Sequence, residues 1–325
     1  RTKADLPYAV KGFDIASEQI SLKNQTPVIP PVNVAGKPLQ VTEGDIITIT
    51  GKGISIKVDR STGSIISYVF RGSEIISDPL QPCFWRVPTD NDEGGGSRGF
   101  AGRWRKAGLD RYNARVKTLD IKAQDNGDVV MNVSSDLVFL EERTMEFRGS
   151  YTFRTDGSIL FSMDINLADG FPPLARVGMK FSMPASYDNI KWYGRGPFES
   201  YQDRKESAGV GLWSGSVADQ YFPYVMHQEN GNKTDVRWLE ITDDAETGMK
   251  ITGTPLMEVN VQNYSQEALN MAKPSKKLFR GDKTYVNIDL RQMGLGGDDS
   301  WSPRVHEEYQ LKEKNYKFGF VISPM

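Results

Sequence analysis

The sequence has 325 residues, 38% of them hydrophobic and 10% aromatic, which is enough apolar material for one large buried core or two smaller ones. Forty basic and 42 acidic side chains leave a formal charge of −2 without a long run of like charge, so nucleic-acid and membrane partners are not expected. The one cysteine, Cys83, cannot form an internal disulfide, and no apolar run approaches the roughly 20 residues that span a bilayer. Cytoplasm and periplasm both stay open as compartments.

The first part of the chain has the pattern of a domain tail followed by a linker. Four apolar residues look like the last strands of a smaller β-sandwich: Phe13, Ile15, Ile20 and Leu22. Four prolines then fall within residues 26–38, where they fix an extended backbone and remove hydrogen-bond donors. We therefore expect a domain tail over residues 1–25, a linker over 26–38 and a single domain over 39–325.

The domain after the linker shows the period of β-strands. Apolar residues alternate with small or polar ones most clearly over residues 159–167, and the pattern recurs at 54–58, 129–133, 257–261, 286–290 and 316–322. Turn signals such as Asn126-Gly127 and Asp156-Gly157 separate these runs. Helical spacing is brief, near residues 100–107 and 265–272. The pattern predicts an all-β, antiparallel fold.

The first candidate segment, residues 83–96, passes from bulky aromatic residues through acidic ones to glycines. Its polar part is Asp90, Asn91 and Asp92, and its glycines are Gly94, Gly95 and Gly96. Successive glycines favour a mobile loop, which can act as a lid over a site. A plain surface loop with its aspartates capping the backbone is the alternative. The downstream glutamate and the spacing of a calcium loop are missing, so no metal site is predicted.

The second candidate segment, residues 192–204, combines aromatic rings with charged side chains: Arg195, Glu199, Tyr201, Asp203 and Arg204. Pyranose rings present C–H faces to aromatic surfaces, and guanidinium and carboxylate groups bind hydroxyls, so this composition suits a sugar site. The same groups also build structural corners held by polar networks. Both interpretations stay open on the residues alone.

The third candidate segment, residues 293–303, leads through glycines and Asp299 to Trp301, which a proline follows closely. An indole at the edge of such a loop is suited to stacking on a sugar. The alternative is an ordinary core tryptophan.

Four segments in this order resemble the small-chain domain of family 2 glycoside hydrolase β-galactosidases. They are residues 84–92, 192–204, 221–232 with Glu229 and Asn230, and 296–303, and the resemblance covers about residues 40–325. It implies a large antiparallel, galactose mutarotase-like β-supersandwich, preceded in residues 1–25 by the last strands of an immunoglobulin-like β-sandwich.

The resemblance also implies site residues. Trp301, with Asp299 beside it, would line the galactoside pocket, and Gly94, Gly95 and Gly96 would gate the mouth of that pocket. The other polar residues named above would support these motifs. His227 and His306 depart from the family pattern and are expected to be structural, and Phe198 stands at a usually polar position.

Catalysis is expected outside this chain. Retaining enzymes of this family use two glutamates on a barrel, and no segment here resembles those motifs. The resemblance implies no catalytic residue and no cofactor in this chain, a divalent cation of the whole enzyme on the barrel, and three kinds of partner: the catalytic barrel on the same chain or a partner subunit, a β-galactoside, and further copies in a homo-oligomer. A free-standing carbohydrate-binding module and an aldose epimerase are the alternatives, the latter with only His227 and His306 as imidazoles.

Overall fold

The computed structural model describes residues 1–20, 37–272, 278–299 and 304–325. The strands are β1 (Gln40–Thr42), β2 (Ile46–Gly51), β3 (Ile54–Asp59), β4 (Ser64–Phe70), β5 (Ser73–Ile76), β6 (Asp78–Cys83), β7 (Asn113–Ala123), β8 (Val129–Val138), β9 (Thr144–Phe153), β10 (Ile159–Leu167), β11 (Arg176–Pro184), β12 (Asn189–Gly196), β13 (Gly209–Ser216), β14 (Lys233–Thr242), β15 (Gly248–Gln262), β16 (Lys283–Gln292) and β17 (Asn315–Pro324). The helices are α1 (Asp90–Glu93), α2 (Phe100–Ala107) and α3 (Gln266–Met271). The strand pairings are antiparallel, which confirms the predicted all-β fold.

The long strand β15 is the branch point of the sheet. Its first half pairs with β17, its second half pairs with β16, and β14 lies along its other edge. From β17 the order continues through β10, β9 and β8 to β7, and from β16 it continues through β11 to β6. β14 pairs with β12, which pairs with β13.

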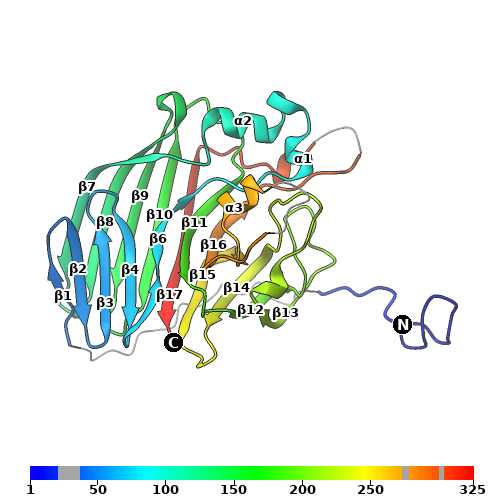
Figure 1. Ribbon diagram of the computed structural model, residues 1–325, viewed down its shortest axis with the longest axis horizontal. Helices are drawn as coiled ribbons and strands as arrows, with labels where there is room; N and C mark the ends of the chain where they lie inside the picture. The colour runs from blue at the N-terminus through cyan, green and yellow to red at the C-terminus, as the bar shows by residue number, and fades with distance from the viewer. Residues whose placement is uncertain (21–36, 273–277, 300–303) are drawn as a thin grey trace.

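The meander β1 to β4 forms a second layer over the branch β7 to β10 (Figure 1). An added Cβ on Gly63, in the turn between β3 and β4, would lie 2.6 Å from Val133 of β8, so the layers are in close contact. In β10 the alternating residues Ile159, Phe161 and Ile165 are buried between them. One continuous apolar cluster therefore holds the two layers together.

The second half of β15 is buried on both faces. Apolar Val259 and Val261 join the core, while Glu258, Asn260 and Gln262 point the other way and are also buried. On β16, Asp289 lies opposite Glu258 and Asn287 lies opposite Asn260. Side chains two residues apart share a face of a strand, so these five polar residues form one layer. We call Glu258, Asn260, Gln262, Asn287 and Asp289 the polar face.

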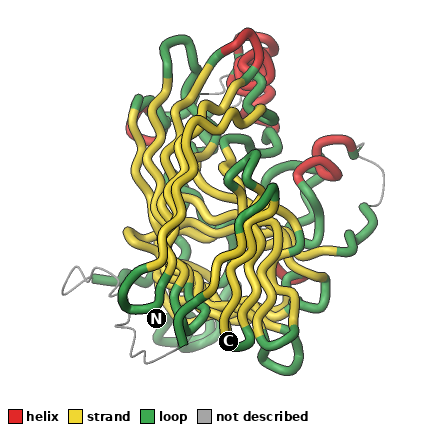
Figure 2. Tube along the Cα trace, turned by 90° about the vertical axis from the view of Figure 1, so that its left-hand side faces the viewer, coloured by secondary structure: helices red, strands yellow, loops and turns green. Residues whose placement is uncertain are grey.

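α1 and α2 lie near one end of the strands, whereas α3 lies apart from them, beside the sheet (Figure 2). α2 buries Phe100, Trp104 and Ala107 at helical spacing and ends at Gly108, whose φ of +71° suits glycine. Within the described part of the chain, no helix is long and apolar enough to cross a membrane.

The expected strands near the N-terminus are not found in the described residues 1–20. An isolated bridge joins Leu6 and Ala9, and Phe13, Ile15 and Ile20 are exposed. A strand needs a neighbour to satisfy its backbone, and no described strand pairs with this stretch. Leu22 and residues 26–36 of the expected linker lie outside the described residues. The immunoglobulin-like assignment of residues 1–25 stays a prediction.

Candidate functional site

Arg86 and Asp92 form a buried ion pair that connects the first motif with the third. Arg86 follows β6 and is 0% exposed, and its Nε and Nη2 donate to the Asp92 carboxylate at 3.0 and 2.8 Å. Its Nη1 and Nη2 also donate to the carbonyls of Met293 and Gly294. Burial disfavours the charged guanidinium, but Asp92 outweighs this effect and the pKa of Arg86 is raised. The bidentate pair with Asp92 fixes the guanidinium of Arg86, which in turn holds the start of the 293–303 segment.

Two further side chains hold the next residues of the same segment. Asn91 Nδ2 donates to the carbonyl of Leu295 at 3.1 Å, and Asp203 Oδ2 accepts from the N–H of Gly296 at 2.7 Å. An added Cβ on Gly294 would lie 2.6 Å from Asp203 Oδ2, so this approach needs glycine. We call Arg86, Asn91 and Asp203, acting on the backbone of residues 293–296, the brace.

The glycines of the first motif link short helical turns. Thr89 and Asp92 form a capping box at the start of α1. Gly94 ends α1, Gly95 has a φ of +82°, and Gly96 begins a single 3-10 turn that leads to α2. This glycine segment, for which both a mobile lid and a plain surface loop were considered, is a compact and largely exposed connection. Its role as a gate stays a prediction.

Glu199 and its partners join the second motif to the 221–232 segment. The carboxylate of Glu199 accepts hydrogen bonds from Arg204, from the hydroxyl of Tyr224 and from the N–H of Gly231. Arg204 also lies over the ring of buried Tyr201, 5.6 Å from its centroid. These contacts fix two long loops relative to each other.

Arg195 on β12 makes contacts of the same kind. Its Nε donates to Asp235 at 2.6 Å, and its Nη1 donates to the carbonyls of Lys205 and Ala208. Arg195 therefore supports the loop that carries Asp203 rather than pointing to an open pocket.

The described part of the third motif ends at residue 299, before Trp301, the residue predicted to stack on the sugar. Asp298 pairs with exposed His306, and this carboxylate raises the pKa of the imidazole. Asp299 lies at the edge of the described residues. Trp301 lies outside them, so its place in the pocket stays a prediction.

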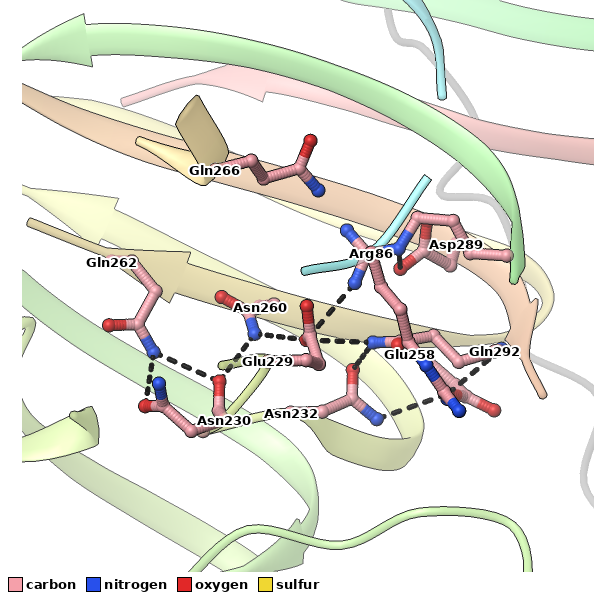
Figure 3. A network of polar contacts seen from close by, with 12 residues as sticks. Arg86, Glu229, Asn230, Asn232, Glu258, Asn260, Gln262, Gln266, Asp289 and Gln292 are labelled. Carbon is pink, nitrogen blue, oxygen red and sulfur yellow. Dashed lines mark hydrogen bonds and ion pairs between the residues drawn. The ribbon is translucent and has the colours of Figure 1, made fainter. Parts of the chain in front are cut away.

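Glu229 and Asn230 reach the polar face and organise its hydrogen bonds (Figure 3). Glu229 Oε1 lies 3.1 Å from Arg176 Nη2 and accepts from Asn260 at 2.7 Å and Gln292 at 3.1 Å. The carbonyl of Asn230 accepts from Asn260 and Gln262. The loop after the 221–227 segment is thereby fastened to β15 and β16.

A buried cluster of charges accompanies this network. Arg176 of β11 lies between Glu229 and Asp289, with its Nε 3.6 Å from Asp289 Oδ2. Burial raises the pKa of Asp289 well above its usual value, and burial raises the pKa of Glu258 to about 7. Glu258 accepts from Gln202, Asn232 and the N–H of Gln292, and these bonds oppose the shift.

This cluster was not predicted from the sequence. Only the apolar half of residues 257–261 entered the prediction of a strand, and five residues were not among the functional candidates: Arg176, Glu258, Asn260, Asp289 and Gln292. The trace of it in the sequence is the alternation of Glu258, Asn260 and Gln262 with apolar residues, which by itself is equally typical of a solvent-facing row of polar side chains. Among the residues that the structure describes, no group of three or more His, Cys, Asp or Glu side chains could hold a metal ion.

The family model and the similar proteins both point to β-galactosidases. The family model for the beta galactosidase small chain matches residues 50–322. The chain is 35% identical to a β-galactosidase of Priestia megaterium over 327 residues, covering 100% of this chain and 31% of that protein. It is 31% identical to a β-galactosidase of Vibrio cholerae over 328 residues, covering 98% and 31%. The chain thus spans 31% of the length of these relatives.

Among solved structures, the chain is similar to galactose 1-epimerase from Lactobacillus acidophilus. The TM-score is 0.42 at 6% identity, covering 86% of this chain and 94% of that chain. A putative aldose 1-epimerase from Escherichia coli gives a TM-score of 0.43 at 10% identity, covering 88% and 99%.

Proposed function

The chain belongs to the β-galactosidase small-chain family, and on this premise we propose that it completes the galactoside pocket of a β-galactosidase without supplying the catalytic carboxylates. The brace is the observation that carries the proposal. Arg86, Asn91 and Asp203 come from two motifs and hold four consecutive residues of a third, the one that leads to Trp301.

Preorganisation is the physical reason for such a brace. A glycine-rich segment loses much conformational entropy when it is ordered. If the segment became ordered only on binding, this free-energy cost would weaken the binding of a ligand at its end. Here the backbone of residues 293–296 is already held by buried or half-buried side chains. We propose that this fixed approach presents Asp299 and Trp301 to the sugar, with the indole stacking on the pyranose.

The catalytic glutamates would come from the barrel of the whole enzyme. Retention requires two carboxyl groups roughly 5 to 5.5 Å apart with access to the glycosidic bond. In this chain the clustered carboxylates Glu229 and Asp289 are buried and face Arg176. We assign them to the support of loops.

The proposed surface for the barrel lies on the loops that Glu199 joins. Phe198, Phe222 and Val225 are more than half exposed, and Phe222 packs on Tyr224 with ring centroids 4.5 Å apart. Tyr224 in turn bonds Glu199, next to Phe198. Exposed apolar side chains gathered by such contacts are typical of protein interfaces.

Substitution of Trp301 tests the pocket directly. In the whole enzyme, Trp301→Ala is expected to weaken binding of a galactoside inhibitor by about 1 to 3 kcal/mol, because a large apolar contact is lost. The measurement is the inhibition constant. Trp238→Ala serves as the control, since Trp238 packs on Lys250 and Tyr193 of this domain. An unchanged inhibition constant in Trp301→Ala would overturn the proposal.

Substitution of Asp203 tests the brace. Asp203→Ala removes the acceptor of the Gly296 N–H, so we expect KM for a galactoside to rise about tenfold, equivalent to roughly 1.4 kcal/mol. Asp203→Asn keeps an acceptor oxygen and should restore most of the affinity. Equal KM values for Asp203→Ala and the unsubstituted enzyme would show that the brace does not act on the pocket.

A further inference from the structure

We propose that the cavity over the polar face is a second carbohydrate site, which binds one neutral monosaccharide. The cavity has a volume of about 280 Å³. Its polar and aromatic lining includes Gln81, Lys180, Asn260, Gln262, Tyr264 and Asn287. No residue of the 293–299 segment lines it.

Two buried oxygen atoms in the lining lack a partner in the described protein. Gln262 Oε1 and Asn287 Oδ1 make no hydrogen bond, although these residues are only 4% and 7% exposed. The amide nitrogen of Gln262 is fixed on Asn230, which leaves its oxygen as the free end. A buried acceptor without a donor is unfavourable, and a hydroxyl group of a ligand satisfies it.

The charges around the cavity are matched, which favours a neutral ligand. Glu229 faces Arg176 at 3.1 Å, and Lys180 faces Glu267 at 3.5 Å. At the rim, the carboxylate of Asp78 accepts a hydrogen bond from Lys283. An anion or a cation would have to displace one of these pairs. A polyol instead adds hydroxyl donors for the orphan oxygens and can accept from the ammonium of Lys180.

Size and aromatic lining select a single sugar ring. Sites for drug-sized ligands occupy about 300 to 1,000 Å³, so a cavity of about 280 Å³ suits one ring and not a chain of them. Tyr264 and Tyr285 both line the cavity, and Tyr264 is held by edge packing on Tyr221 at 4.9 Å. Their rings offer faces to the C–H groups of a pyranose.

Titration of D-galactose and D-glucose into the whole enzyme tests the site, with glycerol as a small polyol probe and calorimetry as the readout. The Trp301→Ala background removes the contact proposed for the other pocket, so the two proposals can fail separately. We expect saturable hexose binding to persist in that background. Loss of all hexose binding in Trp301→Ala would overturn the cavity site and leave the pocket proposal standing.

Asn287→Leu is the decisive variant. Leucine fills the space of the amide without its orphan oxygen, so we expect affinity for the hexose to fall at least tenfold while the thermal midpoint stays equal or rises. Asn263→Leu is the matched control, because Asn263 is equally buried and also has an orphan oxygen but does not line the cavity. If Asn287→Leu does not fold, Lys180→Met repeats the test at the rim. Unchanged hexose affinity, absence of saturable hexose binding, or equal affinity for glycerol and hexoses would each overturn the proposal.

Discussion

Replacing Arg86 with methionine is expected to lower the free energy of unfolding by about 3 to 5 kcal/mol, because it leaves the buried carboxylate of Asp92 without its partner. Both side chains are almost fully buried, with 0% and 1% exposure, so water cannot take the place of the guanidinium. The loss should appear in urea unfolding as a lower midpoint with an unchanged slope.

A surface pair in the same region provides the control. Arg105 pairs with Glu93 at the protein surface, where the two side chains are 46% and 45% exposed. Arg105→Met should cost less than about 1 kcal/mol, because exposed ion pairs contribute little. In the double variant Arg86→Met/Asp92→Leu most of the loss should be recovered, apart from about 1 kcal/mol for the lost capping box at Thr89. A loss in Arg86→Met no larger than in Arg105→Met would contradict this role of the ion pair.

The most regular strands were predictable because one of their faces meets the core and the other meets water or small groups. The run from Ile159 to Leu167 shows this alternation, and the structure places it in β10 between β9 and β17. The brief helical spacing at 100–107 and 265–272 likewise corresponds to α2 and α3. Local periodicity was sufficient in these places.

The polar face was not predictable from the same rule. Alternation in a strand distinguishes two faces but does not reveal what covers the second one. Glu258 and Asn260 look like solvent-facing residues, yet Asn232 and Glu229 fold over them from a loop about 30 residues earlier in the chain. The brace has the same origin, since Arg86 meets Met293 across 207 residues. Such contacts depend on topology, which no local pattern encodes.

The candidate motifs were located as segments, while the contacts of their members required the fold. Asp203 and Arg195 both belong to the 192–204 segment, but Asp203 binds the backbone of Gly296 and Arg195 supports the loop around Lys205. Their residue types gave no indication of this division. Whether the 192–204 segment belongs to a sugar site or to a structural corner therefore has to be decided for each of its residues separately.

Stability is expected to fall as pH rises from about 5 to 8, with Glu258 as a main cause. Burial raises its pKa from 4.5 to about 7 in the folded protein. Between these values the folded state holds a proton that the unfolded state has released, so the free energy of unfolding falls by about 1.4 kcal/mol per pH unit. The total from this group is about 3 kcal/mol, fully lost above the folded pKa. Asp289, whose pKa is also raised by burial, acts in the same direction.

Glu258→Gln identifies the contribution of this one carboxyl. Its amide does not titrate and keeps an oxygen for Asn232 and for the N–H of Gln292, so the variant should lose much of the slope between pH 5 and 7 and gain most relative to the unsubstituted protein near pH 8. Urea unfolding at several pH values measures both quantities. Glu141→Gln, at a glutamate whose side chain is 61% exposed, separates the loss of a buried charge from the loss of any charge. Parallel pH profiles for Glu258→Gln and the unsubstituted protein would mean that the bonds from Gln202, Asn232 and Gln292 outweigh the cost of burial. A steeper profile in the unsubstituted protein would mean that burial raises the pKa of Glu258, so that the folded protein keeps this proton at pH values between 4.5 and about 7, where the unfolded chain has released it.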